Sequence, residues 1–216
     1  MKGKLICISG IDGSGKSSII ESLVRYYEKS DATAFDAMQP CRYLNKLKST
    51  LGEFTKEKMF KVLGAEIPNI CYCADFHYNV IHQIAPAISA NKLVFVHRYD
   101  LCCKAYSMLS ECDMELIDSL LSPVPKPDVH FYLDVDIEVA IERINQRRSK
   151  EGKAVTEKEN LSTLSRALDN YNSLLLQDKY SDVIRINNNN GLQECLNQIL
   201  TFTEPLLKKE QLYGCS

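Results

Sequence analysis

The sequence predicts a single α/β domain in which a five-stranded parallel sheet is flanked by helices. Two observations support this prediction. Short apolar runs alternate along the chain with longer segments whose apolar residues recur at helical spacing. The strand-like runs are apolar on both faces, which is typical of parallel strands covered by helices on both sides. We find no repeat or linker that divides residues 1–216, and 216 residues with 45% hydrophobic content can bury a sizeable core.

The expected elements follow one another in a regular order. The first strand, KLICIS (4–9), leads through a glycine-rich segment into a helix over 16–28, where Ile19, Ile20 and Leu23 lie on one stripe. The other expected strands are TAFDAM (33–38), LVFV (93–96), VHFYLD (129–134) and DVIRI (182–186). The other expected helices cover residues 69–90, 137–147, 159–177 and 192–207.

The segment between the first strand and the first helix, GIDGSGKSS, has the spacing GxxxxGK[ST] of a phosphate-binding loop. Glycines let successive N–H groups point at one phosphate, Lys16 reaches the outer phosphates, and the Ser17 hydroxyl can ligate Mg²⁺. The alternative is a glycine-rich turn that caps a helix, but such a turn has no need of a Lys-Ser pair at this spacing. The expected ATP-binding residues of the loop are Gly10, Gly13, Ser14, Gly15, Lys16, Ser17 and Ser18.

Two further features indicate a second, anionic substrate. Asp12 lies inside the loop, where a carboxylate is repelled by phosphates unless a cation or a hydroxyl group of the acceptor lies between them. The third strand runs through VFV into His97 and Arg98, so two basic residues stand at its end. Asp12 thus points to a second substrate, and the basic strand end points to an anion bound there.

Three segments together resemble the thymidylate kinase family of nucleoside monophosphate kinases. GIDGSGKSS is similar to the family's phosphate loop, HRYDLCCKAY to its DRY-x-x-S-x-x-AYQ segment, and PDVHFYLDVDIEVAIERINQRR to its PDxxxxLDVxPExAxxRxxxR run. The resemblance extends along most of the chain. It implies a P-loop kinase fold, ATP and Mg²⁺, a small-molecule monophosphate acceptor (nominally dTMP), a mobile lid after the fourth strand, and a homodimer.

The resemblance also assigns roles at the end of the third strand. Arg98 matches the arginine that holds the acceptor phosphate, a task suited to a bidentate guanidinium. His97 stands where the family has an aspartate, and a histidine does not organise the water shell of Mg²⁺ as a carboxylate does. Asp100, Asp134 or Asp12 could supply that carboxylate. The alternative for His97 is a polar residue at a strand end without a catalytic role.

The expected lid covers about residues 143–158, and its first part, RINQRRSKEGK, is strongly basic. Cations that close over the transferring phosphoryl group stabilise its charge and exclude water. In the family, either the phosphate loop or the lid supplies a catalytic arginine, and this loop has none. Arg147 and Arg148 are therefore the expected catalytic pair, and Arg143, on the helix, is expected to contact the nucleotide. The alternative is a solvated, charged helix end.

The acceptor pocket departs from the family at three positions. Phe76 stands where an arginine reads the thymine base, Ser107 replaces a glutamine, and Gln39 replaces the glutamate of the REPGGT turn. These changes remove hydrogen bonds to the base, so the acceptor is not limited to dTMP. The alternatives are a different nucleotide, a nucleoside or a specialised metabolite. A nucleotide-binding regulatory protein without transfer activity is also open, and so is plain core packing of Phe76.

The expected catalytic residues are Lys16, Arg98, Arg147, Arg148 and Asp12. The expected acceptor contacts are Asp12, Gln39, Arg42, Tyr72, Phe76, His97, Arg98, Tyr99 and Tyr106. A net charge of -2 gives no overall basic field, so neither nucleic acid nor an anionic membrane is an expected partner. The nine cysteines lack CxxC spacing and several lie in apolar segments, which favours reduced thiols in a cytoplasmic protein over disulfides or a structural zinc site.

Overall fold

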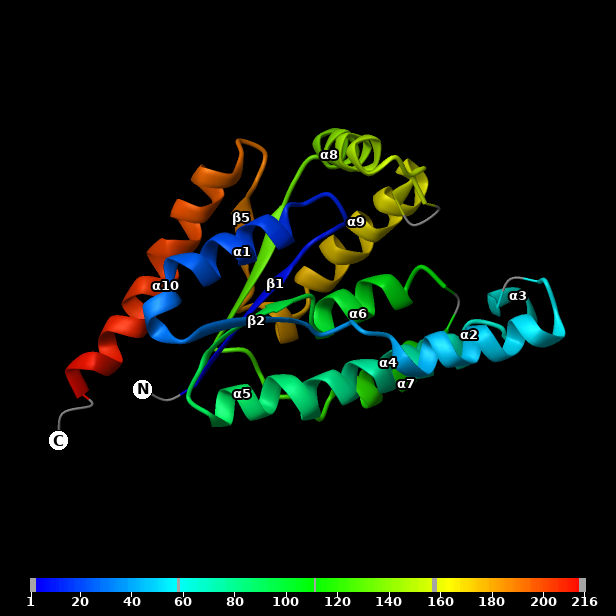
Figure 1. Cartoon of the computed structure of the whole chain (residues 1–216), viewed down its shortest axis with the longest axis horizontal. Helices are drawn as coiled ribbons and strands as arrows, with labels where there is room; N and C mark the ends of the chain where they lie inside the picture. The colour runs from blue at the N-terminus through cyan, green and yellow to red at the C-terminus, as the bar shows by residue number, and fades with distance from the viewer. Residues whose placement is uncertain (1–2, 58, 111, 157–158, 214–216) are drawn as a thin grey trace.

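The computed structural model describes residues 3–57, 59–110, 112–156 and 159–213. Its centre is a five-stranded, fully parallel sheet with the strand order β2-β3-β1-β4-β5 (Figure 1). The strands are β1 (Lys4–Ser9), β2 (Ala32–Asp36), β3 (Leu93–His97), β4 (Val129–Asp134) and β5 (Ile184–Asn187). The predicted fold class, an α/β fold with a five-stranded parallel sheet, is confirmed.

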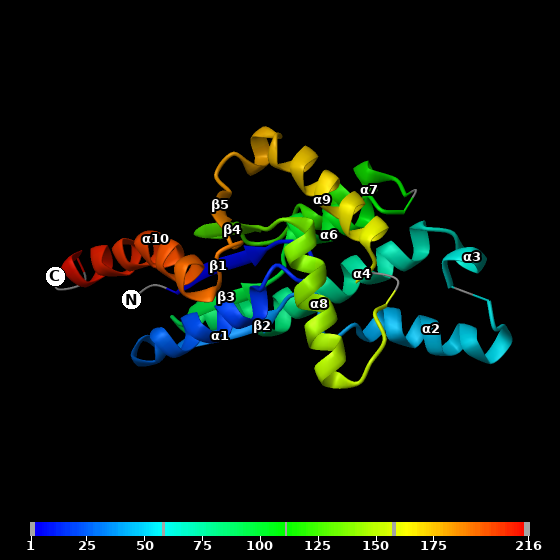
Figure 2. The same cartoon turned by 90° about the horizontal axis from the view of Figure 1, so that it is seen from above.

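Helices cover both faces of this sheet (Figures 1 and 2). They are α1 (Lys16–Tyr26), α2 (Arg42–Phe54), α3 (Met59–Leu63), α4 (Glu66–Asn79), α5 (Ala85–Ser89), α6 (Asp100–Ser107), α7 (Met114–Leu121), α8 (Ile137–Glu151), α9 (Leu161–Leu175) and α10 (Leu192–Tyr213). Short turns are η1 (Glu28–Ser30), the π-helical η2 (Val80–Ile84) and η4 (Asp178–Tyr180). No helix in the described ranges is both long and apolar enough to cross a membrane.

The central strand β1 shows why the sequence folds into layers. Ile6 and Ile8 pack with α1 and α10 on one face, whereas Leu5 and Cys7 pack with α4 and α6 on the other. All four side chains are 2% exposed or less, because successive side chains of a strand point to opposite faces and both faces are covered. A third apolar cluster joins α6, α8 and α9 around Tyr132 of β4, and it supports the helix that carries the basic segment.

Some elements differ from the sequence prediction. The expected helix over 69–90 is divided into α4, η2 and α5, since a π turn interrupts its regular spacing. The helices α2, α3, α6 and α7 were missed, and α2 and α3 contain no buried residue among those described. Strand β2 ends at Asp36 rather than at residue 38, which places this carboxylate at the carboxyl end of the sheet.

A buried carboxylate from α4 fixes the start of α2. Asp75 is 1% exposed and accepts hydrogen bonds from the backbone N–H groups of Arg42 (2.6 Å), Tyr43 (2.8 Å) and Leu44 (3.0 Å). The residue that precedes the helix, Cys41, makes no side-chain capping bond. Asp75 therefore satisfies three N–H groups that a helix leaves free at its start, and it does so with a negative charge at the positive end of the helix dipole.

We expect Asp75→Ala to lower the free energy of unfolding by about 3 kcal/mol, because three backbone donors at the start of α2 lose a buried, charged acceptor. Urea unfolding followed by circular dichroism measures the change. The matched control is Asp113→Ala: Asp113 caps α7 by accepting from the N–H groups of Glu115 and Leu116 at an exposed site, so it should cost only about 1 kcal/mol. Equal losses for the two variants would contradict the role of burial.

Candidate functional site

All five strands are parallel, so their carboxyl ends meet at one edge of the sheet, where α/β proteins bind their ligands. The glycine-rich loop follows β1 at this edge, Asp36 ends β2, and His97 ends β3. Strand β1 lies between β3 and β4, and the chain connections on its two sides run in opposite directions. The expected phosphate loop therefore lies at the switch point of the sheet.

The backbone of this loop requires glycine at several positions. Gly10, Gly13 and Gly15 have φ values of 148°, 84° and 89°, which L side chains rarely adopt. A Cβ atom on Gly13 would lie 2.4 Å from the carbonyl oxygen of Ala140 in α8. The loop is thus packed against the first turns of α8, and only glycine allows this approach. Ser18, the last residue of the expected set, is exposed on α1.

Lys16 is folded into the loop. Its Nζ atom donates to the carbonyl oxygens of Gly10 (2.9 Å) and Ile11 (2.6 Å) and to Ser14 Oγ (3.2 Å), and the residue is 4% exposed. Burial lowers the pKa of Lys16 to about 8, and the nearby Arg98 charge adds to this effect. The side chain is charged at neutral pH and held by neutral carbonyl groups, which a phosphate can replace as a stronger partner.

Asn188 and Arg143 complete this side of the site. Asn188 Nδ2 donates to the carbonyl oxygen of Ser14 (2.7 Å), and Arg143 Nη2 donates to the carbonyl oxygen of Asn188 (2.8 Å). Within the described part of the chain, Arg143 Nη1 and Asn188 Oδ1 are buried polar atoms without a hydrogen-bond partner. Arg143 was predicted as a nucleotide contact, whereas Asn188 was not predicted. Its position after the last strand was the available signal.

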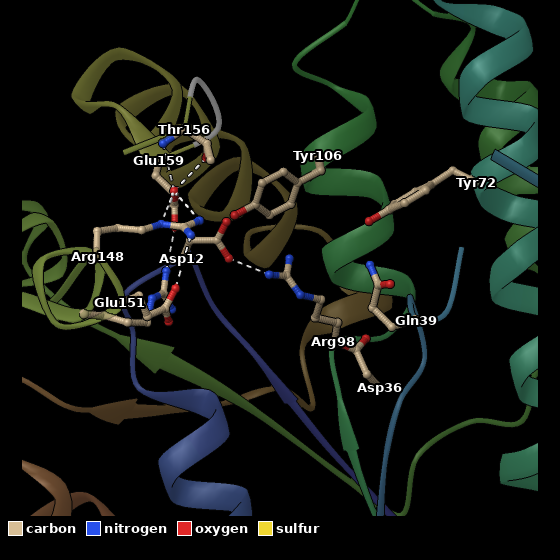
Figure 3. Close-up of a pocket in the computed structure, with 11 residues that line it drawn as sticks. Asp12, Asp36, Gln39, Tyr72, Arg98, Tyr106, Arg148, Glu151, Thr156 and Glu159 are labelled. Carbon is tan, nitrogen blue, oxygen red and sulfur yellow. Dashed lines mark hydrogen bonds and ion pairs between the residues drawn. The ribbon is translucent and has the colours of Figure 1, made fainter. Parts of the chain in front are cut away.

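A cavity of about 470 Å³ opens between the loop, the ends of β2 and β3, and the lid (Figure 3). Seven of its lining residues were predicted as site residues: Asp12, Gln39, Tyr72, Arg98, Tyr106, Arg147 and Arg148. Four were missed: Asp36, Glu151, Thr156 and Glu159. The fold therefore brings residues from distant parts of the chain to one cavity, and most of the expected acceptor and lid residues meet there.

Arg98 and Asp12 form an ion pair at the centre of the cavity (Figure 3). Arg98 Nη2 lies 2.5 Å from Asp12 Oδ1, and the guanidinium carbon lies 5.6 Å from the centroid of the Tyr106 ring. Burial favours the neutral acid, but the Arg98 and Lys16 charges outweigh it and hold the pKa of Asp12 below its usual range. Arg98 has a φ of 66°, a left-handed conformation that costs energy for a residue with a side chain. This backbone geometry turns the guanidinium into the cavity.

His97 lies between two polar side chains. Its Nδ1 atom is 3.1 Å from Asp36 Oδ2, and its Nε2 atom is 3.4 Å from Ser17 Oγ. Burial lowers the pKa of His97 and outweighs the opposing contribution of Asp36. For Asp36, burial raises the pKa, but the hydrogen bonds from His97 and Met38 and the charges of His97 and Arg98 together outweigh it, so the net shift is downward. At neutral pH the contact is therefore a hydrogen bond from Nδ1–H to a carboxylate.

The lid arginines are held by one buried acid, Glu159, which is 5% exposed. Glu159 accepts from Arg147 Nη2 (2.6 Å), from Nε and Nη2 of Arg148 (2.7–3.1 Å), and from both N–H and Oγ1–H of Thr156 (Figure 3). Burial alone would raise the pKa of Glu159, but the hydrogen bonds from Arg148 and Thr156 lower it to about 2. This Glu159 cluster fixes both arginines at the cavity wall. Residues 157–158 of the expected lid lie outside the described residues.

Four expected acceptor contacts do not line this cavity: His97, described above, and Phe76, Tyr99 and Arg42. Phe76 and Tyr99 are each 0% exposed and pack edge to face in the core, with ring centroids 5.2 Å apart. The Arg42 guanidinium stacks on Tyr78 and donates to Asn79 Oδ1 (3.3 Å). Ser107, another position that departs from the family, is buried and donates to Asn69 Oδ1 (3.1 Å). These side chains stabilise the layer of α4 and α6 behind the cavity.

Three features define a P-loop phosphotransferase: a phosphate loop whose glycines have positive φ, a lysine folded into that loop, and arginines on the other side of a cavity. The chain belongs to the thymidylate kinase family, whose model matches residues 8–199. It is 29% identical to the thymidylate kinase of Leptospira interrogans over 93% of this chain and 97% of that protein. It is 32% identical to the thymidylate kinase of Brachyspira hyodysenteriae over 68% of this chain and 71% of that protein. It is 28% identical to the probable thymidylate kinase of Thermococcus kodakarensis over 95% of this chain and 99% of that protein.

Proposed function

We propose that this protein transfers the γ-phosphoryl group of ATP to dTMP. The observation that carries the proposal is the cavity between the phosphate loop and the lid, where Arg98 pairs with Asp12 of the loop and the lid residues Arg147 and Arg148 line the wall. Membership of the family supports ATP as the phosphoryl donor, and the names of the relatives support dTMP as the acceptor. Neither the comparisons nor the cavity favours another acceptor, since Phe76 and Ser107 make internal contacts and do not line it.

In this proposal the nucleotide phosphates lie in the loop from Gly10 to Ser18, and Lys16 exchanges its carbonyl partners for phosphate oxygens. The unpartnered Arg143 Nη1 and Asn188 Oδ1 beside the loop suit polar groups of the nucleotide. Arg98 holds the acceptor phosphate, Asp12 orients Arg98, and Gln39, Tyr72 and Tyr106 surround the remainder of the acceptor. The lid arginines stabilise charge on the transferring group.

The residues near the loop also fit a magnesium ion. The Ser17 hydroxyl and the Asp12 carboxylate are hard oxygen donors of the kind that Mg²⁺ prefers. The described residues contain no cluster of three or more metal-ligating side chains, which agrees with an ion held largely by substrate phosphates and water. When bound, Mg²⁺ would neutralise charge on the phosphates.

The proposal is tested by steady-state kinetics with ATP, Mg²⁺ and a panel of dTMP, dUMP, dCMP, UMP and AMP. We expect dTMP to give the highest kcat/KM, at about 10⁴ M⁻¹s⁻¹ or above. A higher kcat/KM for another monophosphate would reassign the acceptor. Tight ATP binding without turnover of any compound would support the regulatory alternative.

The double variant Arg147→Ala/Arg148→Ala should lower kcat by about 100-fold while changing the KM for ATP far less, because these cations act on charge that develops during transfer. The matched control is Lys150→Ala/Lys153→Ala, which removes the same charge from the same lid outside the Glu159 cluster and should leave kcat unchanged. If the arginine variant has a normal kcat and a raised KM for ATP, Arg147 and Arg148 belong to a solvated, charged helix end and do not act in transfer.

We also propose that the subunit is a single domain that forms a homodimer in the cytoplasm. The family resemblance supports the dimer, and so does a group of exposed apolar side chains on α2, α3 and α4, which are Tyr43, Phe54, Phe60 and Ile67. The eight described cysteines are all free thiols, in keeping with a reducing compartment. Light scattering coupled to size exclusion measures the mass in solution, and a monomer at micromolar concentration would contradict the dimer.

A further inference from the structure

Three side chains from three different elements form a line at the edge of the site. Asp36 ends β2, His97 ends β3, and Ser17 lies in the first turn of α1. Asp36 and His97 are register partners in the pairing of β2 with β3, so the sheet itself places them side by side. His97 then spans from Asp36 Oδ2 (3.1 Å from Nδ1) to Ser17 Oγ (3.4 Å from Nε2). No role assigned above uses this arrangement.

The Asp36 carboxylate is held at both oxygens, since Oδ1 accepts from the N–H group of Met38 (2.9 Å) and Oδ2 faces His97. A carboxylate only accepts hydrogen bonds, so Nδ1 of the imidazole carries the proton and Nε2 is left as an acceptor. The Ser17 hydroxyl can then donate to Nε2. With its proton directed at the ring, the Ser17 oxygen presents its lone pairs away from His97.

We propose that Asp36 and His97 are positioning residues for Ser17. Asp36 fixes the tautomer and orientation of the His97 ring, and the ring orients the Ser17 hydroxyl so that its oxygen is free to bind the divalent cation of a metal–nucleotide complex. The inference rests on the proposed function for the presence of that complex and is independent of the acceptor. It explains a histidine at the end of β3, because the carboxylate is supplied from the neighbouring strand.

The alternative is that Asp36 and His97 only stabilise the strand ends. A metal-binding measurement separates the two, because partners of a metal ligand typically change metal affinity 10- to 100-fold when they are replaced. We would measure Mn²⁺ binding to the protein–ADP complex by electron paramagnetic resonance, and metal-free ADP binding by calorimetry. In Asp36→Asn the amide can donate to Nδ1, which favours the tautomer whose Nε2–H competes for the Ser17 oxygen.

We expect Asp36→Asn and Ser17→Ala each to weaken Mn²⁺ binding by about 10-fold or more, and to change metal-free ADP binding far less than Mn²⁺ binding. The double variant should bind Mn²⁺ no more weakly than Ser17→Ala alone, because Asp36 acts through Ser17. The matched control is Asp182→Asn, which changes an exposed carboxylate paired with Lys126 and should have no effect.

Additive losses in the double variant would overturn the inference, since Asp36 would then act on the ion without Ser17. Unchanged Mn²⁺ affinity in either single variant would overturn it as well. These results do not depend on turnover: a protein that shows the expected pattern but does not phosphorylate dTMP refutes the proposed acceptor and retains the positioning role. Normal dTMP turnover with an unchanged Mn²⁺ affinity in Asp36→Asn refutes the positioning role and retains the proposed acceptor.

Discussion

Replacement of Lys16 by alanine should lower kcat by about 100- to 1,000-fold, the loss typical when one fixed donor to a developing charge is removed. Lys16 is buried in the loop, its pKa is lowered to about 8, and it is charged at neutral pH. Its carbonyl partners from Gly10 and Ile11 hold the ammonium group where the phosphates of a nucleotide would lie. In the variant, neither a water molecule nor a mobile lysine side chain would hold a positive charge at this fixed position.

The measurement is steady-state turnover with saturating ATP and dTMP, together with thermal unfolding of the variant. Lys92→Ala is the control, because Lys92 forms a partly exposed ion pair with Asp31 at the opposite end of β3. That variant should keep the parent kcat. If Lys16→Ala keeps its fold and its kcat, the loop is not the site of phosphoryl transfer.

Replacement of Arg98 should be as damaging to acceptor use as replacement of Lys16 is to turnover. We expect Arg98→Ala to lower kcat/KM for dTMP by about 100-fold or more, because a charge-assisted, bidentate contact to the phosphate is lost and Asp12 is left without its partner. The KM for ATP should change little. Arg98→Lys keeps the charge without the planar fork and should give an intermediate value.

The left-handed backbone at Arg98 allows a control for stability. Its φ of 66° is strained for alanine and unstrained for glycine, so Arg98→Gly should be more stable than Arg98→Ala by about 1 kcal/mol. Both variants should be equally poor with dTMP if the guanidinium binds the phosphate. Activity that follows stability instead, with Arg98→Gly close to the parent, would show that Arg98 supports the fold and not the acceptor.

The parts of the site that the sequence predicted are those whose signal is local. The loop from Gly10 to Ser17 has its glycines, lysine and serine within one short segment, and the strand before it and helix after it are strongly periodic. The family resemblance placed Arg98 and the lid arginines. The structure places all three arginines at the cavity, whereas their roles in transfer stay predictions.

The missed parts depend on contacts between residues far apart in the sequence. Asp36 became a site residue because β2 pairs with β3, and Asn188 because the end of β5 meets the loop. Glu159 carries no motif, and its importance comes from its contacts with the lid arginines. Phe76 shows the reverse case: the resemblance placed it in the pocket, whereas its packing against Tyr99 agrees with the alternative of a core residue. A sequence pattern specifies which residues are buried better than it specifies which neighbours they meet.

The strand order has a consequence for the synthesis of this protein on the ribosome. The first strand to emerge, β1, is the central one, and its partners β3 and β4 are made later. Until β4 has been translated, the nascent chain carries β1 with an unpaired edge, which is a site for aggregation. The Asn188 contact that braces the loop joins residues 174 positions apart. A chain released early therefore holds the complete glycine motif but not the braced loop, so nucleotide-dependent stabilisation should begin only with the nearly full-length product.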